Sequence, residues 1–382
     1  MACLFIAQSV RKHGAKVPVE ESKYIENKCY FKEIKVLKKR DIEEVISRIP
    51  YYKIENRVFL ITGANGFLAS NIVHTLMYLN KCYLSQKCIV IALCRNKEKA
   101  ESIFGEYISD KNFKLCVQSV EEKICLTDKV DYIIHAASNA VTSEFGKIPV
   151  DILKANVIGT YSLLEFAKIQ KVKGFLFFSS GAVYGNVPLK VSQIKEEDVF
   201  PLDYLQTTNC YAEGKRAGEV LCKAYWEQHR IPTKIVRISH TYGPGINLND
   251  GRVFSDFVSS ICRNKNLEIK GSGNDVRPFC YITDAIVAFF LILFDGENGE
   301  TYNMANCAET VTIYELAKIL VNQAFPERNL RIEAKHLAKD LEIKKTTVNT
   351  NKLQKLGWTP QVDIIEGFRR TVQSFEEDRS DK

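Results

Sequence analysis

Three residues of this sequence have side chains that together can move a proton on or off an alcohol. Tyr211 and Lys215 are four positions apart, so on a helix they lie on one face. An ammonium beside a phenol favours the phenolate and lowers the pKa of the phenol from about 10 towards working pH. Ser180 offers a hydroxyl. We expect Ser180, Tyr211 and Lys215 to act on a carbinol while a cofactor moves the hydride.

A Tyr-x-x-x-Lys pair is also common on protein surfaces, so the elements that position it matter. The apolar run 174–178 before Ser180 is short and aromatic, as is typical of a buried parallel strand. A hydroxyl at the end of such a strand opens onto the crevice where doubly wound α/β proteins bind ligands. Other strand-like runs alternate with helical patterns, at 57–61, 88–93, 113–117, 130–134 and 233–239. The alternation predicts an α/β fold with a Rossmann-type, doubly wound parallel sheet.

The first of these strands leads into a glycine turn, Thr62-Gly-Ala-Asn-Gly66-Phe-Leu-Ala69, which is followed by a helical pattern. Glycine permits the tight turn, and the helix N-terminus offers free N–H groups to an anion. A strand, a glycine turn and a helix in this order predict a phosphate cradle for a dinucleotide.

Two further strand ends are expected to line the dinucleotide site. Arg95 and Asn96 follow the second strand, where an arginine without a carboxylate suits a 2′-phosphate, so we favour NADP over NAD. An exposed loop arginine would look the same. Small residues after His135 would let the cofactor lie against the fourth strand. The residues expected to bind the cofactor are Gly63, Asn65, Gly66, Phe67, Leu68, Arg95, Asn96, Ala136, Ala137, Ser138, Ser179, Tyr211 and Lys215.

The length of 382 residues suggests two domains or one domain with a lobe. We expect an N-terminal extension at 1–55, a dinucleotide-binding domain at 56–240 and, at 241–382, mainly a smaller C-terminal lobe that binds substrate. The extension is lysine-rich, and residues 41–49 predict a short helix with Asp41 as its N-cap. In the last part, helices are expected near 313–324 and 364–376.

The composition excludes several classes of protein. Apolar content of 46% and charged content of 26% are typical of a soluble globular protein. The longest apolar stretch, 285–294, is half of what a membrane span needs, and no signal peptide is expected. The net charge of +7 comes without a dense basic block, which argues against nucleic acid. The twelve cysteines lack zinc spacing, so we expect reduced thiols, no metal and a cytoplasmic location.

Together the motifs resemble the extended short-chain dehydrogenase/reductase family, specifically its NAD(P)-dependent nucleotide-sugar epimerases, dehydratases and decarboxylases. The resemblance covers residues 57–375. It rests on six motifs in the family's order, which begin at Thr62, His135, Ser179, Tyr211, Arg237 and Tyr302. It implies a nucleotide-diphosphate sugar as substrate and a homodimer that uses the Tyr211 helix. It also implies that Ser180 and Tyr211 orient and deprotonate the substrate hydroxyl, while Lys215 tunes Tyr211 and holds the nicotinamide ribose.

Within the family, residues 248–257 and 271–279 look most like the UDP-glucuronate decarboxylase branch. Arg252 and Arg277 would then face the nucleotide diphosphate or a sugar carboxylate, which guanidinium binds bidentately. His240 would bind substrate at a position where the family usually has asparagine.

The sequence departs from the family at two further positions. Gly181 and Ala182 follow Ser180 where dehydratases usually have Asp-Glu and decarboxylases a glutamate in the second position. Dehydration is therefore disfavoured, because water elimination lacks its acid and base. Ser119 also replaces an aspartate that usually contacts adenine.

Three functions stay open from the sequence. One is epimerisation or decarboxylation through a transient 4-keto sugar. Another is net reduction of a 4-keto sugar by NADPH. A function of a different class is a non-catalytic dinucleotide-binding sensor, against which the intact Ser180, Tyr211 and Lys215 argue.

Overall fold

A seven-stranded parallel sheet forms the centre of the computed structural model, which describes residues 37–188, 190–334 and 346–380. The chain runs outward from β1 through β2 to β3 and returns to β4 on the other side of β1, so the strand order reverses between β1 and β4. This arrangement confirms the predicted doubly wound α/β fold. In spatial order the strands are β3 (Phe113–Val117), β2 (Ile89–Cys94), β1 (Val58–Thr62), β4 (Tyr132–His135), β5 (Gly174–Ser180), β7 (Thr233–Ile238) and β12 (Thr301–Met304).

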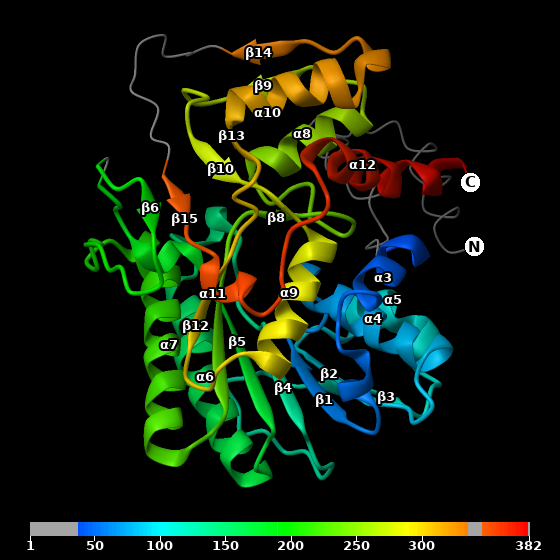
Figure 1. The fold of residues 1–382 in the computed structure, drawn as a ribbon, viewed down its shortest axis with the longest axis vertical. Helices are drawn as coiled ribbons and strands as arrows, with labels where there is room; N and C mark the ends of the chain where they lie inside the picture. The colour runs from blue at the N-terminus through cyan, green and yellow to red at the C-terminus, as the bar shows by residue number, and fades with distance from the viewer. Residues whose placement is uncertain (1–36, 189, 335–345, 381–382) are drawn as a thin grey trace, which may run out of the picture. The chain divides into compact units, whose positions relative to one another are not determined.

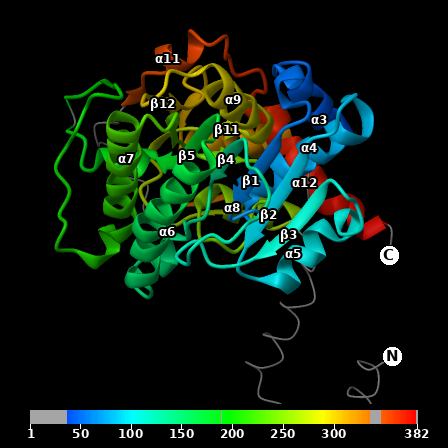
Figure 2. The same cartoon turned by 90° about the horizontal axis from the view of Figure 1, so that it is seen from below.

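Helices cover both faces of the sheet (Figures 1 and 2). One face packs against α6 (Pro149–Gln170) and α7 (Cys210–His229). The other packs against α4 (Phe67–Cys82) and α9 (Ile282–Asp295), with α5 (Lys97–Phe104) beside α4. Among the described residues, no helix is both long and apolar enough to cross a bilayer.

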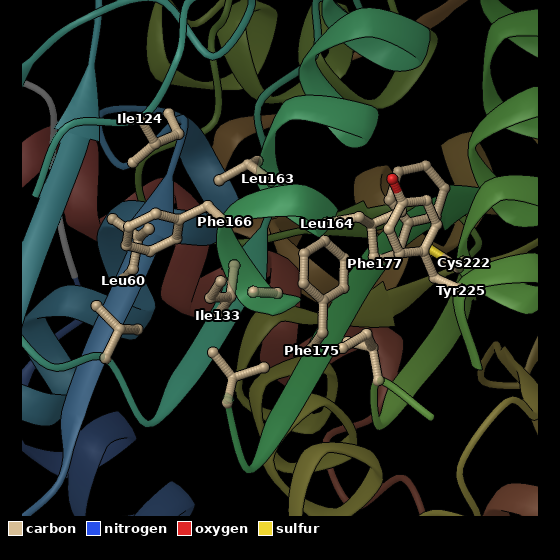
Figure 3. Packing of buried hydrophobic residues seen from close by; sticks show 14 of the residues in the cluster. Leu60, Ile124, Ile133, Leu163, Leu164, Phe166, Phe175, Phe177, Cys222 and Tyr225 are labelled. Atoms are coloured by element: carbon tan, nitrogen blue, oxygen red, sulfur yellow. The ribbon is translucent and has the colours of Figure 1, made fainter. Parts of the chain in front are cut away.

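An apolar cluster lies between the sheet and the α6–α7 layer (Figure 3). Phe175 and Phe177 of β5 are fully buried there. Leu163 and Leu164 of α6 belong to the same cluster, as does Tyr225 of α7. Because the catalytic candidates lie at one end of β5 and in the first turns of α7, this core fixes the strand and the helix on which they lie.

A smaller lobe lies beyond the carboxyl ends of the strands (Figure 1). Its helices are α8 (Val253–Cys262), α10 (Ile313–Ile319) and α12 (Ile364–Ser380), and a single π turn follows α10 where one continuous helix was expected. The chain crosses the expected division at residue 240 more than once, since α9 and β12 return to the sheet. The remaining pairs of short strands are β9 (Leu267–Ile269) with β14 (Ile332–Ala334), β10 (Val276–Pro278) with β13 (Thr310–Thr312), β8 (Thr241–Tyr242) with β11 (Cys280–Tyr281), and β6 (Gln193–Ile194) with β15 (Thr347–Val348).

The helix expected at residues 41–49 is α3 (Lys39–Ile46), and the prediction that Asp41 is its N-cap is wrong. Lys38 occupies that position, and Asp41 lies in the first turn with 1% of its surface exposed. Its carboxylate accepts a hydrogen bond from Arg370 Nη1 at 2.9 Å, on α12. The local pattern assigned Asp41 to a cap because its partner, Arg370, is far away in the chain. Residues 1–36 of the extension lie outside the described part of the chain.

Candidate active site

The structure brings the three catalytic candidates together. Ser180 is the last residue of β5, while Tyr211 and Lys215 occupy the first turns of α7. The Ser180 hydroxyl lies close enough to the phenol of Tyr211 to lower its pKa, and Lys215 Nζ lies 5.8 Å from the centre of the Tyr211 ring. The i, i+4 spacing therefore places both side chains of α7 on the face that meets the end of β5.

Lys215 is almost completely enclosed. With 2% of its surface exposed, it donates a hydrogen bond from Nζ to the carbonyl oxygen of Phe178 at 2.7 Å. Burial lowers the pKa of Lys215 to about 7, and the nearby carboxylate of Glu219 works in the opposite direction. The lysine therefore titrates close to neutral pH.

The pKa of Tyr211 differs from the expectation. It is raised by burial, and the hydrogen bond from Ser180 and the charge of Arg252 only reduce that rise. The ammonium beside the phenol was expected to favour the phenolate. Placing a phenolate among protein atoms is unfavourable, however, and this cost raises the pKa although Tyr211 keeps part of its surface accessible. Proton removal from Tyr211 therefore depends on the full set of polar partners around it.

Phe145 is a site residue that the sequence did not identify. Its ring lies parallel to that of Tyr211, and its carbonyl oxygen accepts a hydrogen bond from Cys210 Sγ at 3.5 Å. The short 3-10 turn Thr142–Glu144 leads the chain to this position. The only signal in the sequence was an aromatic residue in the segment after Ser138.

The other three residues expected to bind substrate are His240, Arg252 and Arg277, from the part of the chain after β7. The charge of Arg252 acts on both Tyr211 and His240, and that of Arg277 acts on His240. Arg252 Nη2 also donates to the carbonyl oxygen of Ala140 at 3.0 Å, which links the lobe to the segment after β4. Surrounding protein atoms and the two guanidiniums lower the pKa of His240, although its surface is exposed, so the imidazole is neutral.

The glycine turn has the geometry of a phosphate cradle. Gly63 has a φ of +62°, and a Cβ on this residue would lie 2.7 Å from Ala137 Cα, so the turn lies directly against the end of β4. Gly66 donates from its N–H to the carbonyl oxygen of Gly63 at 2.8 Å and is the N-cap of α4. Phe67 and Leu68 are the first residues of that helix, where backbone N–H groups point towards an anion.

A chain of buried hydrogen bonds connects the start of this glycine turn to β4 and α6. His135 lies between two threonines, with Nδ1 2.8 Å from Thr62 Oγ1 and Nε2 3.0 Å from Thr160 Oγ1. Thr62 Oγ1 also accepts from the N–H of Ala137 at 3.2 Å. Burial lowers the pKa of His135 to about 3, so the imidazole stays neutral and acts as a structural link.

The other expected cofactor ligands have different surroundings. Asn65 Nδ2 donates to the carbonyl oxygen of Asn96 at 3.3 Å, and Asn96 caps α5 by accepting from the N–H of Lys99. Arg95 is exposed at the end of β2. Ser138 Oγ is buried without a hydrogen-bond partner among the described residues, as fits a group that a ligand satisfies. The hydroxyl of Ser179 instead donates to Glu219, so cofactor binding stays a prediction for the Ser179 backbone alone.

Comparison with known proteins agrees with this geometry. A model described as the NAD dependent epimerase/dehydratase family matches residues 59–305. The chain belongs to this family. The result confirms the resemblance in the motifs.

The names of curated relatives of this epimerase/dehydratase family member describe enzymes that act on nucleotide sugars. UDP-glucuronic acid decarboxylase 2 of Arabidopsis thaliana is 32% identical over 318 residues, which is 83% of this chain and 67% of the relative. The human dTDP-D-glucose 4,6-dehydratase is 30% identical over 329 residues, 83% of this chain and 89% of the relative. Sequence identity of 30 to 32% supports membership of the family, and it does not distinguish a decarboxylase from a dehydratase.

Solved structures share the fold. A UDP-glucose 4-epimerase of Thermotoga maritima with UDP-glucose has a TM-score of 0.69 at 25% identity and covers 84% of this chain and 99% of its own. A dTDP-glucose 4,6-dehydratase of Bacillus anthracis in complex with NAD also has a TM-score of 0.69, at 21% identity, with 85% and 98% covered. The family member described here thus has the fold of proteins solved with NAD and with a nucleotide sugar.

Proposed function

We propose that this protein is an NAD-dependent enzyme that acts on a nucleotide-diphosphate sugar at its C4 carbinol, as an epimerase or as a decarboxylase similar to those of UDP-glucuronate. One observation supports this above the others. The Ser180 hydroxyl at the end of β5 and the charge of Arg252 from the smaller lobe both lower the pKa of the Tyr211 phenol against its burial, and Lys215 Nζ lies 5.8 Å from the same ring. The candidate proton acceptor, Tyr211, is therefore within reach of the charge of Arg252, a group that can bind an anionic substrate.

The residues fit the cofactor that the family implies. The turn from Gly63 to Gly66 lies against the end of β4, and the unpaired hydroxyl of Ser138 lies in the same region of the sheet. These groups would hold the pyrophosphate and the neighbouring part of the dinucleotide, and Lys215 the nicotinamide ribose. When bound, NAD supplies an acceptor for a hydride and later returns it.

The protein's own residues handle the proton. Ser180 would orient the C4 hydroxyl, and Tyr211 would take its proton and give it back at the end of the cycle. The neutral His240 would accept or donate a hydrogen bond to the sugar without adding charge. Arg252 and Arg277 would bind the diphosphate or a uronic carboxylate.

The residues after Ser180 favour this chemistry over dehydration. Gly181 and Ala182 begin the 3-10 turn Gly181–Tyr184, and the N–H of Ala182 donates to Ser180 Oγ at 3.2 Å. Neither residue has a carboxylate to remove or add a proton across C5–C6. Oxidation at C4 alone allows epimerisation, and it allows a 4-keto uronic acid to lose CO₂.

A second candidate is net reduction of a 4-keto sugar by NADPH. It is supported by Arg95, which is exposed at the end of β2 where a 2′-phosphate would lie. The two candidates differ in whether the hydride is returned within one catalytic cycle.

We also propose a homodimer that uses the outer faces of α6 and α7. These helices bear large apolar side chains that are exposed in the single chain, which is the pattern of a protein interface. They are Val150, Leu153, Ile158, Tyr161, Ile169 and Val220.

The first experiment is native mass spectrometry with absorbance of the purified protein, followed by turnover assays on UDP-glucuronate, UDP-glucose and dTDP-glucose. Retained oxidised cofactor and turnover of a UDP-sugar are expected. Tyr211→Phe should abolish turnover and leave cofactor affinity within about twofold, because only the acid/base is removed. Reversible uptake of NADPH by an empty site would favour the reductase. Tight cofactor binding without turnover of any sugar nucleotide would contradict both enzymes and favour the sensor.

A further inference from the structure

Glu219 continues the line of catalytic candidates along α7. It is one helical turn beyond Lys215, just as Lys215 is one turn beyond Tyr211, so the three side chains share one face of the helix. Its carboxylate is buried, and it accepts a hydrogen bond from the hydroxyl of Ser179. Ser179 directly precedes Ser180 in β5. Glu219 therefore lies next to both parts of the site, the lysine and the serine strand.

Arg237 fixes the carboxylate in place. Its Nε donates to Glu219 Oε1 at 3.0 Å and its Nη2 to Oε2 at 2.7 Å, which is a two-point contact. The guanidinium itself is held by the carbonyl oxygen of Glu196 at 2.8 Å and lies 4.7 Å from the ring centre of Tyr184. A bidentate pair of this kind restricts the carboxylate in direction as well as in distance.

We propose that Glu219 is a positioning residue for the candidate active site, which holds Ser179 and hence the end of β5 and places a negative charge one helical turn from Lys215. The inference rests on the proposed function, since it assigns a role relative to Ser180, Tyr211 and Lys215. Glu219 does not touch the reacting atoms. It acts through Lys215, which is itself a catalytic candidate, and through Ser179, which directly precedes Ser180.

Several groups besides Glu219 act on the charge of Lys215. On α7 they are Tyr211 and Cys222, and on β4 the neutral His135 also faces the lysine. The β5 residues in contact are Phe177, under the ammonium, and the carbonyl of Phe178. Glu219 is the largest of the effects that raise the pKa of Lys215 against its burial. Removing this charge should therefore lower the pKa further and leave the lysine neutral at working pH.

The test measures Lys215 directly. Protein labelled with 13C at the lysine Cε is titrated by NMR, and the Lys215 signal is identified by its loss in Lys215→Met. Glu219→Gln keeps the size of the side chain and one acceptor oxygen, but it replaces the other oxygen with an NH2 donor and removes the charge. We expect it to lower the pKa of Lys215 by about 1 unit or more. The high-pH limb of the turnover profile should move to lower pH by a similar amount, because protonated Lys215 is lost earlier.

Glu227→Gln is the matched control. It removes the same charge from the exposed face of the same helix, where Glu227 lies 4.0 Å from Lys223 Nζ. It should leave both the Lys215 titration and the turnover profile as in the wild type. A merely structural role for Glu219 would lower stability and the level of turnover without moving either titration.

An unchanged Lys215 pKa in folded Glu219→Gln would overturn the proposal. If that variant does not fold, Glu219→Asp tests the same effect, because it keeps the charge but shortens the side chain by one methylene and so moves the charge away from Lys215. A smaller downward shift of the Lys215 pKa is then expected, and no shift would overturn the proposal. The NMR titration needs no turnover. A wild type inactive on every sugar nucleotide would thus contradict the proposed function, while the role of Glu219 towards Lys215 would still be decided.

Discussion

The rings of Phe145 and Tyr211 lie nearly parallel, with their centroids 4.9 Å apart and their planes at 12°. One face of the proposed acid/base is therefore covered by a residue from the segment after β4. The Ser180 hydroxyl acts on the phenol end of the same ring and lowers the pKa of Tyr211 against its burial. Together these contacts determine where the Tyr211 oxygen lies and shield part of the ring from water.

Phe145→Ala should reduce kcat by about fivefold, since an aromatic pair contributes about 1 kcal/mol and its loss lets the Tyr211 ring move. Cofactor affinity, measured by fluorescence titration, should change by less than about twofold. Tyr83→Ala is the control, because it removes a half-exposed ring from the pair with Tyr51, at the far end of α4. Equal turnover in Phe145→Ala and the wild type would show that the stacking does not position Tyr211.

Gly63→Ala should weaken dinucleotide binding at least tenfold and lower the free energy of unfolding by about 1 to 3 kcal/mol. The φ of +62° is unfavourable for alanine, and the added Cβ would lie 2.7 Å from Ala137 Cα, a backbone atom that cannot rotate away. Calorimetric titration with NAD and thermal unfolding measure the two effects. Gly105→Ala makes the same change where nothing lies within 4 Å, and it should alter neither quantity. A Gly63→Ala protein that binds NAD normally would rule out the cradle.

Acid should destabilise the protein partly through His135. Its pKa in the folded state is about 3, against about 6.5 in an unfolded chain, so the unfolded state binds the proton first as pH falls. The stability contributed by the neutral imidazole is present above about pH 6.5 and is lost between there and pH 3. The expected slope is about 1.4 kcal/mol per pH unit for this one group.

His135→Gln should therefore flatten the pH dependence of the free energy of unfolding between pH 6.5 and 4, as measured in urea at several pH values. It should also lower stability at pH 7, since the links to Thr62 and Thr160 are changed. The exposed His229→Gln should leave the slope as it is in the wild type. A slope unaffected by His135→Gln would mean that the imidazole is already protonated in the folded protein.

The sheet was predictable because its signals are local. Each central strand is a short run of apolar residues between polar ones, and the glycine turn follows the first run directly. The catalytic candidates were predictable for the same reason, since Tyr211 and Lys215 are related by helical spacing alone. Phe145 and Glu219 were not identified because their roles depend on partners 66 and 40 positions away. Asp41 was misassigned as a cap because its partner Arg370 is 329 positions away. Burial, which reverses the expected direction of the Tyr211 pKa, is equally invisible in a local pattern.

Helix α3 has a consequence for where the protein can be shortened. Arg370 of α12 contacts both Asp41 and Glu44, and Arg48 contacts Asp284 at the start of α9. A shortened chain that begins at residue 56 would keep every candidate site residue, yet it would strip the buried Asp284 of its counter-ion Arg48 and leave Arg370 paired with Glu366 alone. Leaving a buried charge unpaired costs about 3 to 5 kcal/mol, a large share of the stability of an ordinary domain. The segment that folds as one piece is thus longer than the segment that contains the candidate site residues.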